Sequence, residues 1–196
     1  MLLKYYLVTL LTAMLLLGCQ QKVPDNKAAN SILATKKRAV SYAAEQKYDL
    51  AILCIDSALT AQPKNIELYN TKFNILLRSK KYTDGLAVLE QMHKIEANNA
   101  EAYSFQGYIN EKLGNDSLAT TFYNKAIAAC KYRANIKVEE FKNKVNISFL
   151  KQFTEGKVAS IAYIDSLAIR HAGNGFIRDQ KEFIKNFDKE AFLKAL

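Results

Sequence analysis

Thiol and imidazole groups are the side chains of this sequence best suited to act as nucleophiles or metal ligands. The chain has three cysteines, Cys19, Cys54 and Cys130, and two histidines, His93 and His171. A metal site needs several ligands at helical or hairpin spacing, and neither histidine has such a companion. The sequence also contains no nucleophile elbow, phosphate-binding loop or zinc-protease pair. We therefore expect no metal, no cofactor and no enzymatic activity.

Cys19 differs from the other two cysteines because it ends an apolar segment. Residues 5–17 are uncharged and mainly apolar, and Lys4 is the only charged residue in 1–18. Such a segment rises only about 20 Å as a helix, which is less than the roughly 30 Å hydrocarbon core of a bilayer. Residues 1–18 are therefore typical of a signal peptide and not of a membrane span.

The residues Leu16, Leu17, Gly18 and Cys19 resemble the lipobox of bacterial lipoproteins. The resemblance implies that the Cys19 thiol receives a diacylglyceryl group and that the chain is cut before Cys19. Two or three acyl chains give stable membrane attachment. Glutamine at position 20, where an aspartate is associated with inner-membrane retention in some bacteria, implies an outer-membrane location, with the leaflet left open. The alternative is an exported protein with an incidental cysteine.

Two short amphipathic helices, joined by a turn, are predicted for residues 100–133. Tyr103 and Gly107 share one face of the first helix, since they are four residues apart. Ala119, Tyr123 and Ala126 share one face of the second helix, and Gly114-Asn115 breaks the chain between the two. Small residues at positions 107, 119 and 126 permit two helix backbones to approach closely.

The same pattern occurs twice before this segment at a constant spacing. Thirty-four residues earlier, Tyr69 matches Tyr103 and Gly85 matches Ala119, and a further step back Ala51 matches Gly85. A gapless period of 34 residues with this small and aromatic pattern is the signature of tetratricopeptide repeats. Residues 32–133 thus resemble tetratricopeptide repeat proteins. The resemblance implies an all-α, right-handed α-solenoid with helix pairs at 32–65, 66–99 and 100–133. An ordinary helical bundle with accidental spacing is the alternative.

The segments on both sides of the repeats have different predicted roles. Residues 19–31 are polar and contain Pro24, so we expect a flexible tether. Residues 134–196 are expected to form a degenerate fourth helix pair, with a lengthened first helix at 136–153, and a final helix at 176–196. A terminal element must cover the last core face of such an array. We assign that role to the final helix and its phenylalanines, Phe176, Phe183, Phe187 and Phe192, with a second docking surface as the alternative.

The repeat resemblance also implies a binding surface. In this family the first helices of successive units line a concave groove, whose mixed side chains suit an extended peptide or a partner helix. The residues at groove positions are Lys36, Val40, Asn70, Asn74, Leu77, Arg78, Ser104, Tyr108, Glu111 and Lys112.

The charge distribution limits the classes of partner. The formal net charge is +9, and residues 131–196 contribute +5 of it, from 13 basic and 8 acidic residues. A basic excess suits lipid headgroups, acidic partners or nucleic acid. Because no nucleic-acid motif accompanies it and export is predicted, we expect no nucleic-acid partner and mostly solvated helix faces.

The function predicted from these features is that of a lipid-anchored adaptor in a bacterial envelope, facing the periplasm. It would hold a protein or peptide in its groove, as an accessory subunit of a secretion or assembly complex. The alternative is a ligand-capture lipoprotein for a small molecule or glycan, which would need an enclosed pocket beside Tyr108. Cys54 and Cys130 lie two units apart, so we expect no disulfide between them and at least one packed thiol.

Overall fold

The computed structural model describes residues 26–196, with side chains from Ser31 onward. Within this range the regular elements are ten helices and no strands. They are α2 (Asn26–Ala44), α3 (Tyr48–Ala61), α4 (Ile66–Arg78), α5 (Tyr82–Ile95), α6 (Ala100–Lys112), α7 (Asp116–Asn135), α8 (Glu140–Thr154), α9 (Lys157–Arg170), α10 (Gly175–Asn186) and α11 (Lys189–Ala195).

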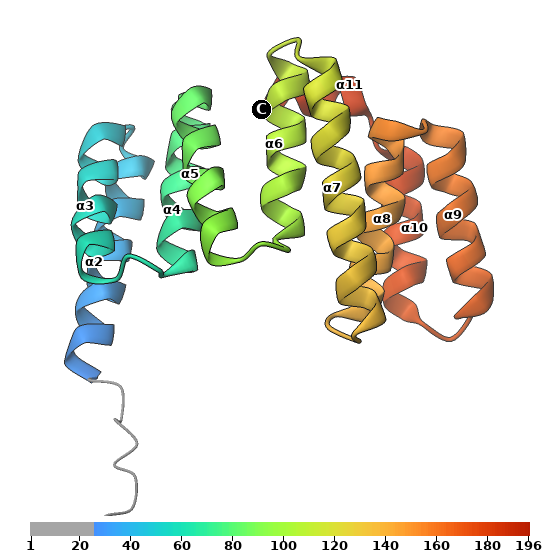
Figure 1. Ribbon diagram of the computed structural model, residues 1–196, viewed down its shortest axis with the longest axis horizontal. Coiled ribbons are helices and arrows are strands. Elements are labelled where there is room, and N and C mark those ends of the chain that lie inside the picture. Colours follow the sequence, from blue (N-terminus) through green and yellow to red (C-terminus); the bar gives the residue numbers. More distant parts are fainter. Residues whose placement is uncertain (1–25) are drawn as a thin grey trace, which may run out of the picture.

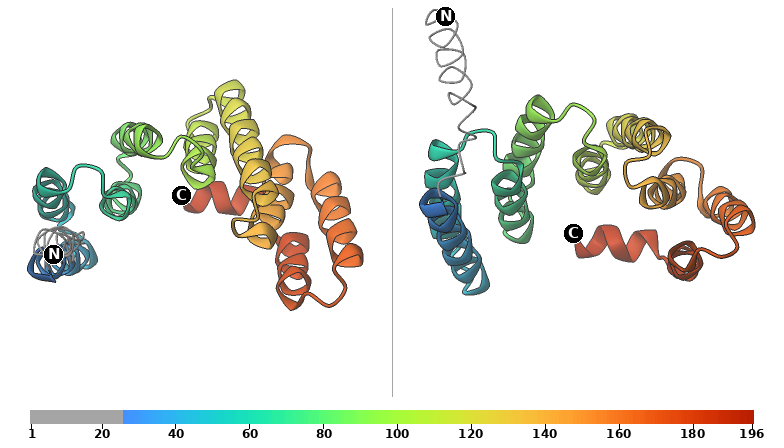
Figure 2. Two further views of the ribbon diagram at one scale, coloured as in Figure 1. Left: turned by 60° about the horizontal axis from the view of Figure 1, so that its bottom comes forward. Right: turned by 90° about the horizontal axis from the view of Figure 1, so that it is seen from below.

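The helices form successive pairs along one long axis, α2 with α3, α4 with α5, α6 with α7, and α8 with α9 (Figure 1). Seen from below, the pairs form an arch, and α11 lies on its inner side (Figure 2). The first helices of the pairs face this concave side. The all-α solenoid predicted from the sequence is confirmed.

The turns inside the first three pairs repeat in detail. Each contains one residue with a left-handed backbone, Gln46, Lys80 or Gly114, with φ of 59°, 58° and 80°. These positions are 34 residues apart. In each turn the next residue donates its N–H to a carbonyl five residues earlier, at 2.8, 2.9 and 2.8 Å. The predicted break at Gly114 is therefore one of three turns with the same backbone geometry in this chain. Glycine is the residue best suited to the left-handed position of such a turn.

The starts of the first helices repeat as well. Asn65 caps α4 by accepting the N–H groups of Glu67 and Leu68, and Asn99 caps α6 by accepting the N–H of Ala102. The hydroxyls of Tyr69 and Tyr103 each donate to a backbone carbonyl six residues earlier, both at 3.1 Å. The 34-residue register is thus present in hydrogen bonds as well as in residue types.

The core of the third pair depends on small residues, as predicted. Ala119 and Ala126 on α7 are 1% and 0% exposed. Gly107 on α6 faces the ring of Tyr123, and a methyl group added there would overlap that ring. The two backbones are close because no side chain separates them at Gly107.

Two predicted boundaries need correction. Helix α2 begins at Asn26, so residues 26–31 of the predicted tether are helical. The first helix of the fourth pair, α8, has 15 residues and is longer than α4 and α6, which have 13 each, but α7 is longer still, with 20. Helix α8 begins only at Glu140, because Lys137 and Glu139 adopt left-handed backbones with φ of 62° and 44°.

The predicted final helix at 176–196 is divided into α10 and α11. The break lies at Phe187 and Asp188, where Asp188 caps α11 by accepting the N–H of Ala191 at 3.0 Å. The break redirects the chain, so that α10 packs on α8 and α9 while α11 returns to α6 (Figure 2). Phe187 and Phe192 pack against the core, but Phe176 and Phe183 are 45% and 54% exposed and cover little of it.

The signal segment 1–18, Cys19 and the tether up to Asp25 lie outside the described residues. Among the helices that are described, none has the length and apolar character needed to cross a membrane.

Candidate functional site

A cleft of about 500 Å³ lies on the concave side, between α4, α6 and α8 and beside α11. We call it the central groove. Its floor is aromatic, formed by Phe105, Tyr108, Phe149 and Phe192. Its polar walls are contributed by Asn70, Asn99, Glu101, Ser104, Arg133, Glu139, Lys142, Asn143 and Asn146.

The walls offer amide groups for hydrogen bonding. Asn70 on α4 and Asn146 on α8 make no side-chain hydrogen bond to another described residue, and Asn146 is exposed. Asn143 uses its amide N–H groups on the carbonyls of Val138 and Glu139, at 2.8 and 3.2 Å. A free carboxamide both donates and accepts, as does each unit of a peptide backbone. Asn70 and Asn146 therefore provide complementary groups on opposite walls.

Arg133 joins the walls at the end of α7. Its guanidinium contacts Glu96 after α5 at 3.1 Å and Glu139 before α8 at 3.3 Å. Its buried Nε has no hydrogen-bond partner among the described residues. An unpaired buried donor is unfavourable, and because this nitrogen is closed to solvent, a ligand in the groove would not reach it without a shift of the guanidinium.

Lys142 adds a second cation at the rim. It contacts Glu139 at 3.1 Å. Lys142 and, to a smaller extent, Arg133 hold the pKa of the Glu139 carboxyl below its usual value. The groove thus has a charged end, which contains both signs, and an amide-lined middle.

The predicted groove residues are divided by the structure. Asn70, Ser104 and Tyr108 line the central groove. Lys36 instead forms an ion pair with Glu67 at 3.3 Å, and Leu77 packs into the core of the second pair. The other residues of the first two units, Val40, Asn74 and Arg78, are exposed but do not line this cleft.

Glu111 and Lys112 were predicted at groove positions but do not line the central groove, because α11 covers them, and α11 also packs on Tyr108. Tyr108 is 6% exposed, and its ring packs on Phe192 at a centroid distance of 5.1 Å. Glu111 pairs with Lys189 at 2.5 Å, and Lys112 donates to the carbonyl of Leu193 at 2.9 Å. Helical spacing places residues on a face but carries no information about a distant segment that covers it.

Sequence reasoning missed the contribution of α7 and α8 to the groove. Arg133, Glu139, Asn143 and Asn146 come from a region that lacks the strict repeat register. Asn143 and Asn146 are three residues apart on one helical face, and that polar pair was a signal for a binding wall.

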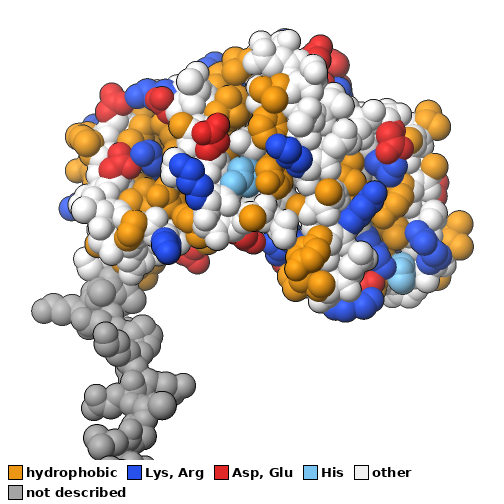
Figure 3. All heavy atoms as spheres, viewed as in Figure 1, with side chains coloured by type: hydrophobic (Ala, Val, Ile, Leu, Met, Phe, Trp, Pro, Cys, Tyr) orange, Lys and Arg blue, Asp and Glu red, His pale blue; other side chains and the backbone are white. Residues whose placement is uncertain are grey.

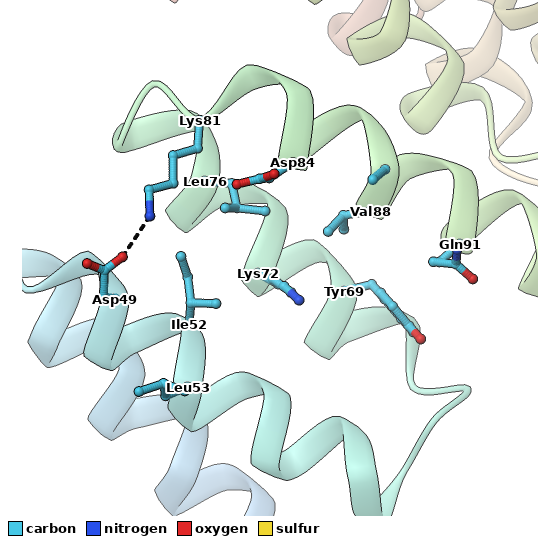
Figure 4. Close-up of a pocket in the computed structure, with 11 residues that line it drawn as sticks. Asp49, Ile52, Leu53, Tyr69, Lys72, Leu76, Lys81, Asp84, Val88 and Gln91 are labelled. Atoms are coloured by element: carbon cyan, nitrogen blue, oxygen red, sulfur yellow. Dashed lines mark hydrogen bonds and ion pairs between the residues drawn. The ribbon is translucent and has the colours of Figure 1, made fainter.

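A second cleft, of about 550 Å³, lies on the opposite face between α3 and α5 (Figure 4). Ile52, Leu76 and Val88 contribute apolar side chains, and an ion pair of 2.7 Å between Asp49 and Lys81 closes one end. Over the whole of this face, hydrophobic side chains lie among charges of both signs (Figure 3). Asp84, Lys72 and Gln91 also line this cleft, so charged and polar groups stand beside its apolar side chains.

The remaining chemically distinctive side chains are packed. His93 stacks on Tyr103 at a ring-centroid distance of 3.8 Å, and its Nε2 lies 2.8 Å from Oε1 of Gln106, so it joins α5 to α6. Cys54 and Cys130 are free, and burial raises the pKa of the Cys130 thiol to about 11. The prediction that at least one of the two thiols is packed is confirmed by Cys130. In the described part of the chain, no cluster of three His, Cys, Asp or Glu could hold a metal.

The repeated turns, caps and helix pairs define a tetratricopeptide-like α-solenoid. Comparison with solved structures finds MamA proteins: "Crystal structure of MamA protein" is 14% identical, with 85% of this chain and 86% of that chain covered and a TM-score of 0.49. "MamA 41-end from Desulfovibrio magneticus RS-1" is 18% identical, with 74% and 78% covered and a TM-score of 0.48. None of these reaches 0.5, so the fold assignment comes from the helix pairs themselves. No protein-family model and no curated protein matches the sequence.

Proposed function

We propose that this chain is a protein-interaction scaffold that holds an extended segment of a partner in the central groove. The observation that carries the proposal is the pair of amides, Asn70 and Asn146, that line opposite walls of a cleft with an aromatic floor and make no side-chain hydrogen bond to another described residue. Together these groups match the alternating donors and acceptors of a peptide backbone.

The groove supports a peptide ligand better than a small molecule or glycan. Small-molecule sites enclose most of the surface of their ligand. Here the rim residues Glu101, Lys142 and Asn146 are exposed, so the cleft beside Tyr108 is open along its length. A chain that continues beyond the site at both ends fits such a cleft.

The same proposal places the scaffold on a membrane. It rests on the lipobox resemblance of Leu16–Cys19 and on the outer-membrane location that Gln20 implies. A lipid anchor on Cys19 would confine the groove to the periplasmic surface and raise its effective concentration for partners there. An accessory role in a secretion or assembly complex fits this arrangement.

The test is crosslinking in the native host, followed by affinity purification and mass spectrometry. The groove variant carries Asn70→Arg and Asn146→Arg, which place two bulky cations on opposite walls. The matched control carries Thr121→Arg, at an exposed position of α7 that does not line the groove. We expect one protein to be recovered with the wild type and the control and lost with the groove variant. Recovery with all three chains would place the partner elsewhere and contradict the proposal.

A further inference from the structure

Helix α11 presents one face to the concave side of the array. Lys189, Phe192, Leu193 and Leu196 follow one another at intervals of three, one and three residues, which is one stripe of a helix. The three apolar members pack against the core cluster of the third and fourth pairs. The stripe has the anchor spacing of amphipathic helices that bind in grooves.

Two side chains of this stripe, Phe192 and Lys189, each contact a defined set of residues on the array. The ring of Phe192 packs among Tyr108, Phe149 and Phe153, at centroid distances of 5.1, 6.4 and 6.1 Å. The ammonium of Lys189 contacts Glu111 and lies 5.3 Å from the ring centroid of Phe153. Glu111 is held in place by the hydroxyl of Tyr123, which donates to its other carboxylate oxygen at 2.6 Å.

The array also binds the end of α11 through the backbone. Lys112 donates to the carbonyl of Leu193 at 2.9 Å, and the hydroxyl of Tyr82 donates to the carbonyl of Leu196 at 2.8 Å. The last carbonyls of a helix have no partner within the helix. Two donors from α5 and α6 are therefore placed where a helix C-terminus needs them.

Helix α11 is held less firmly than the surface that receives it. It has seven residues, and none of them is buried. A helix of this length is not stable alone in water. By contrast, the receptors Tyr108, Glu111 and Lys112 belong to α6, which is packed against α7. Segments with few buried contacts open at low free-energy cost.

We propose that this surface is a helix-docking site, which α11 occupies within the chain and which accepts a partner helix in its place. The partner helix carries the pattern Lys-x-x-Phe-Leu-x-x-Leu, so that its cation meets Glu111 and its aromatic ring meets Tyr108. The inference rests on the proposed scaffold function. Phe192 and Tyr108 also line the central groove, so displacement of α11 extends that groove toward α5.

The test uses the purified full-length chain in detergent and a fluorescein-labelled peptide with the sequence of residues 186–196. Binding is followed by fluorescence anisotropy. The variant Lys189→Glu places two carboxylates together and weakens the docking of α11, but leaves Glu111 free for the lysine of the peptide. Because the apparent Kd falls as the fraction of open site rises, we expect at least tenfold tighter binding than with the wild type.

Three further variants distinguish an effect of the docking site from an effect of charge alone. Lys194→Glu makes the same charge change at an exposed α11 residue without an ion pair to a described residue, and it should leave the affinity at the wild-type value. Adding Glu111→Gln to Lys189→Glu should weaken binding at least tenfold, while glutamine still accepts from Tyr123. Phe192→Ala in the chain releases α11 without a new charge and should tighten binding as Lys189→Glu does.

Equal affinity for the wild type, Lys189→Glu and Phe192→Ala would overturn the proposal. So would unchanged binding of a peptide in which the phenylalanine matching Phe192 is alanine. A dimer on light scattering that dissociates with Phe192→Ala would identify a second copy as the occupant and contradict a partner helix. The peptide-binding assay needs no host protein, so its result is independent of the crosslinking test of Asn70 and Asn146. Either proposal can fail while the other is supported.

Discussion

At the scale of single residues, the contact between Gly107 and Tyr123 decides how closely α6 and α7 pack. Tyr123 is 1% exposed, and its hydroxyl is used by Glu111. Burial, together with that hydrogen bond, raises the pKa of the Tyr123 phenol, so the group remains a donor. The ring therefore has neither space nor freedom to move away from an added side chain.

Gly107→Ala should destabilise the fold by about 1–3 kcal/mol, because the new methyl overlaps a buried ring. Chemical denaturation of the purified chain measures the change. Gly85→Ala is the matched control: its added carbon would lie 3.5 Å from the Phe73 ring, an ordinary contact. Because alanine has a higher helix propensity than glycine, the Gly85→Ala variant should be as stable as the wild type or more stable by roughly 0.5–1 kcal/mol. Equal effects at the two glycines would refute the close contact.

His93 should make stability depend on pH. Burial, as the main cause, lowers its pKa below the ordinary 6.5, and the charge of Lys125 acts in the same direction. The neutral ring is therefore favoured in the folded state. Its contribution is fully present above pH 6.5 and is lost as the pH falls below that value. Thermal melting between pH 7.5 and 5.5 should show a smaller loss for His93→Gln than for the wild type. If the melting temperatures of the two proteins fell equally with pH, His93 would be excluded as the cause of the pH dependence.

At the scale of elements, the caps of the first helices position the groove walls. Asn65 and Asn99 occupy the same place in successive units, and each satisfies N–H groups that have no partner within the helix. The second helices of the first three pairs have no side-chain cap at Lys47, Lys81 or Asn115. Two of the three helices that form the groove, α4 and α6, are therefore capped by a side chain, whereas the third, α8, is not.

Asn99→Ala should cost about 1 kcal/mol of stability, since the cap of α6 is lost. The cap is a hydrogen bond of 2.9 Å to the Ala102 N–H, and the Asn99 amide also donates to Glu96. Asn98→Ala, one residue earlier at an exposed position, is the control and should change little. Denaturant midpoints of the two variants compare them directly. A cost at Asn98 as large as at Asn99 would show that the cap is not the cause.

At the scale of the whole molecule, the helix pairs form an arch with the central groove on its concave side. In the sequence, this arch comes after the segment that contains the candidate lipidation site. The groove lies between α4, α6 and α8, which are the first helices of successive pairs in the arch (Figure 2). A soluble scaffold and a membrane-bound one would have the same groove. A lipid anchor would limit the partners of the groove to proteins at the same membrane surface.

Cys19→Ser should release the protein from the membrane fraction or leave its signal segment uncleaved, because serine cannot form the thioether. Cell fractionation and the mass of the purified chain measure both results. Cys54→Ser, at a partly buried thiol in α3, should stay membrane-bound and processed. Membrane attachment that survives Cys19→Ser would exclude lipidation at this residue.

Local features of this chain were readable from the sequence because they depend on neighbours along the chain. Gly114 marks a turn, Gly107 and Ala126 mark a close helix contact, and the 34-residue period marks successive pairs. The tertiary structure alone decided where α11 lies. Its end is bound by Tyr82, 114 residues away in sequence, and no period relates the two. A repeat period sets contacts between adjacent units, whereas a returning helix is placed by the packing of surfaces that meet only after the chain has folded.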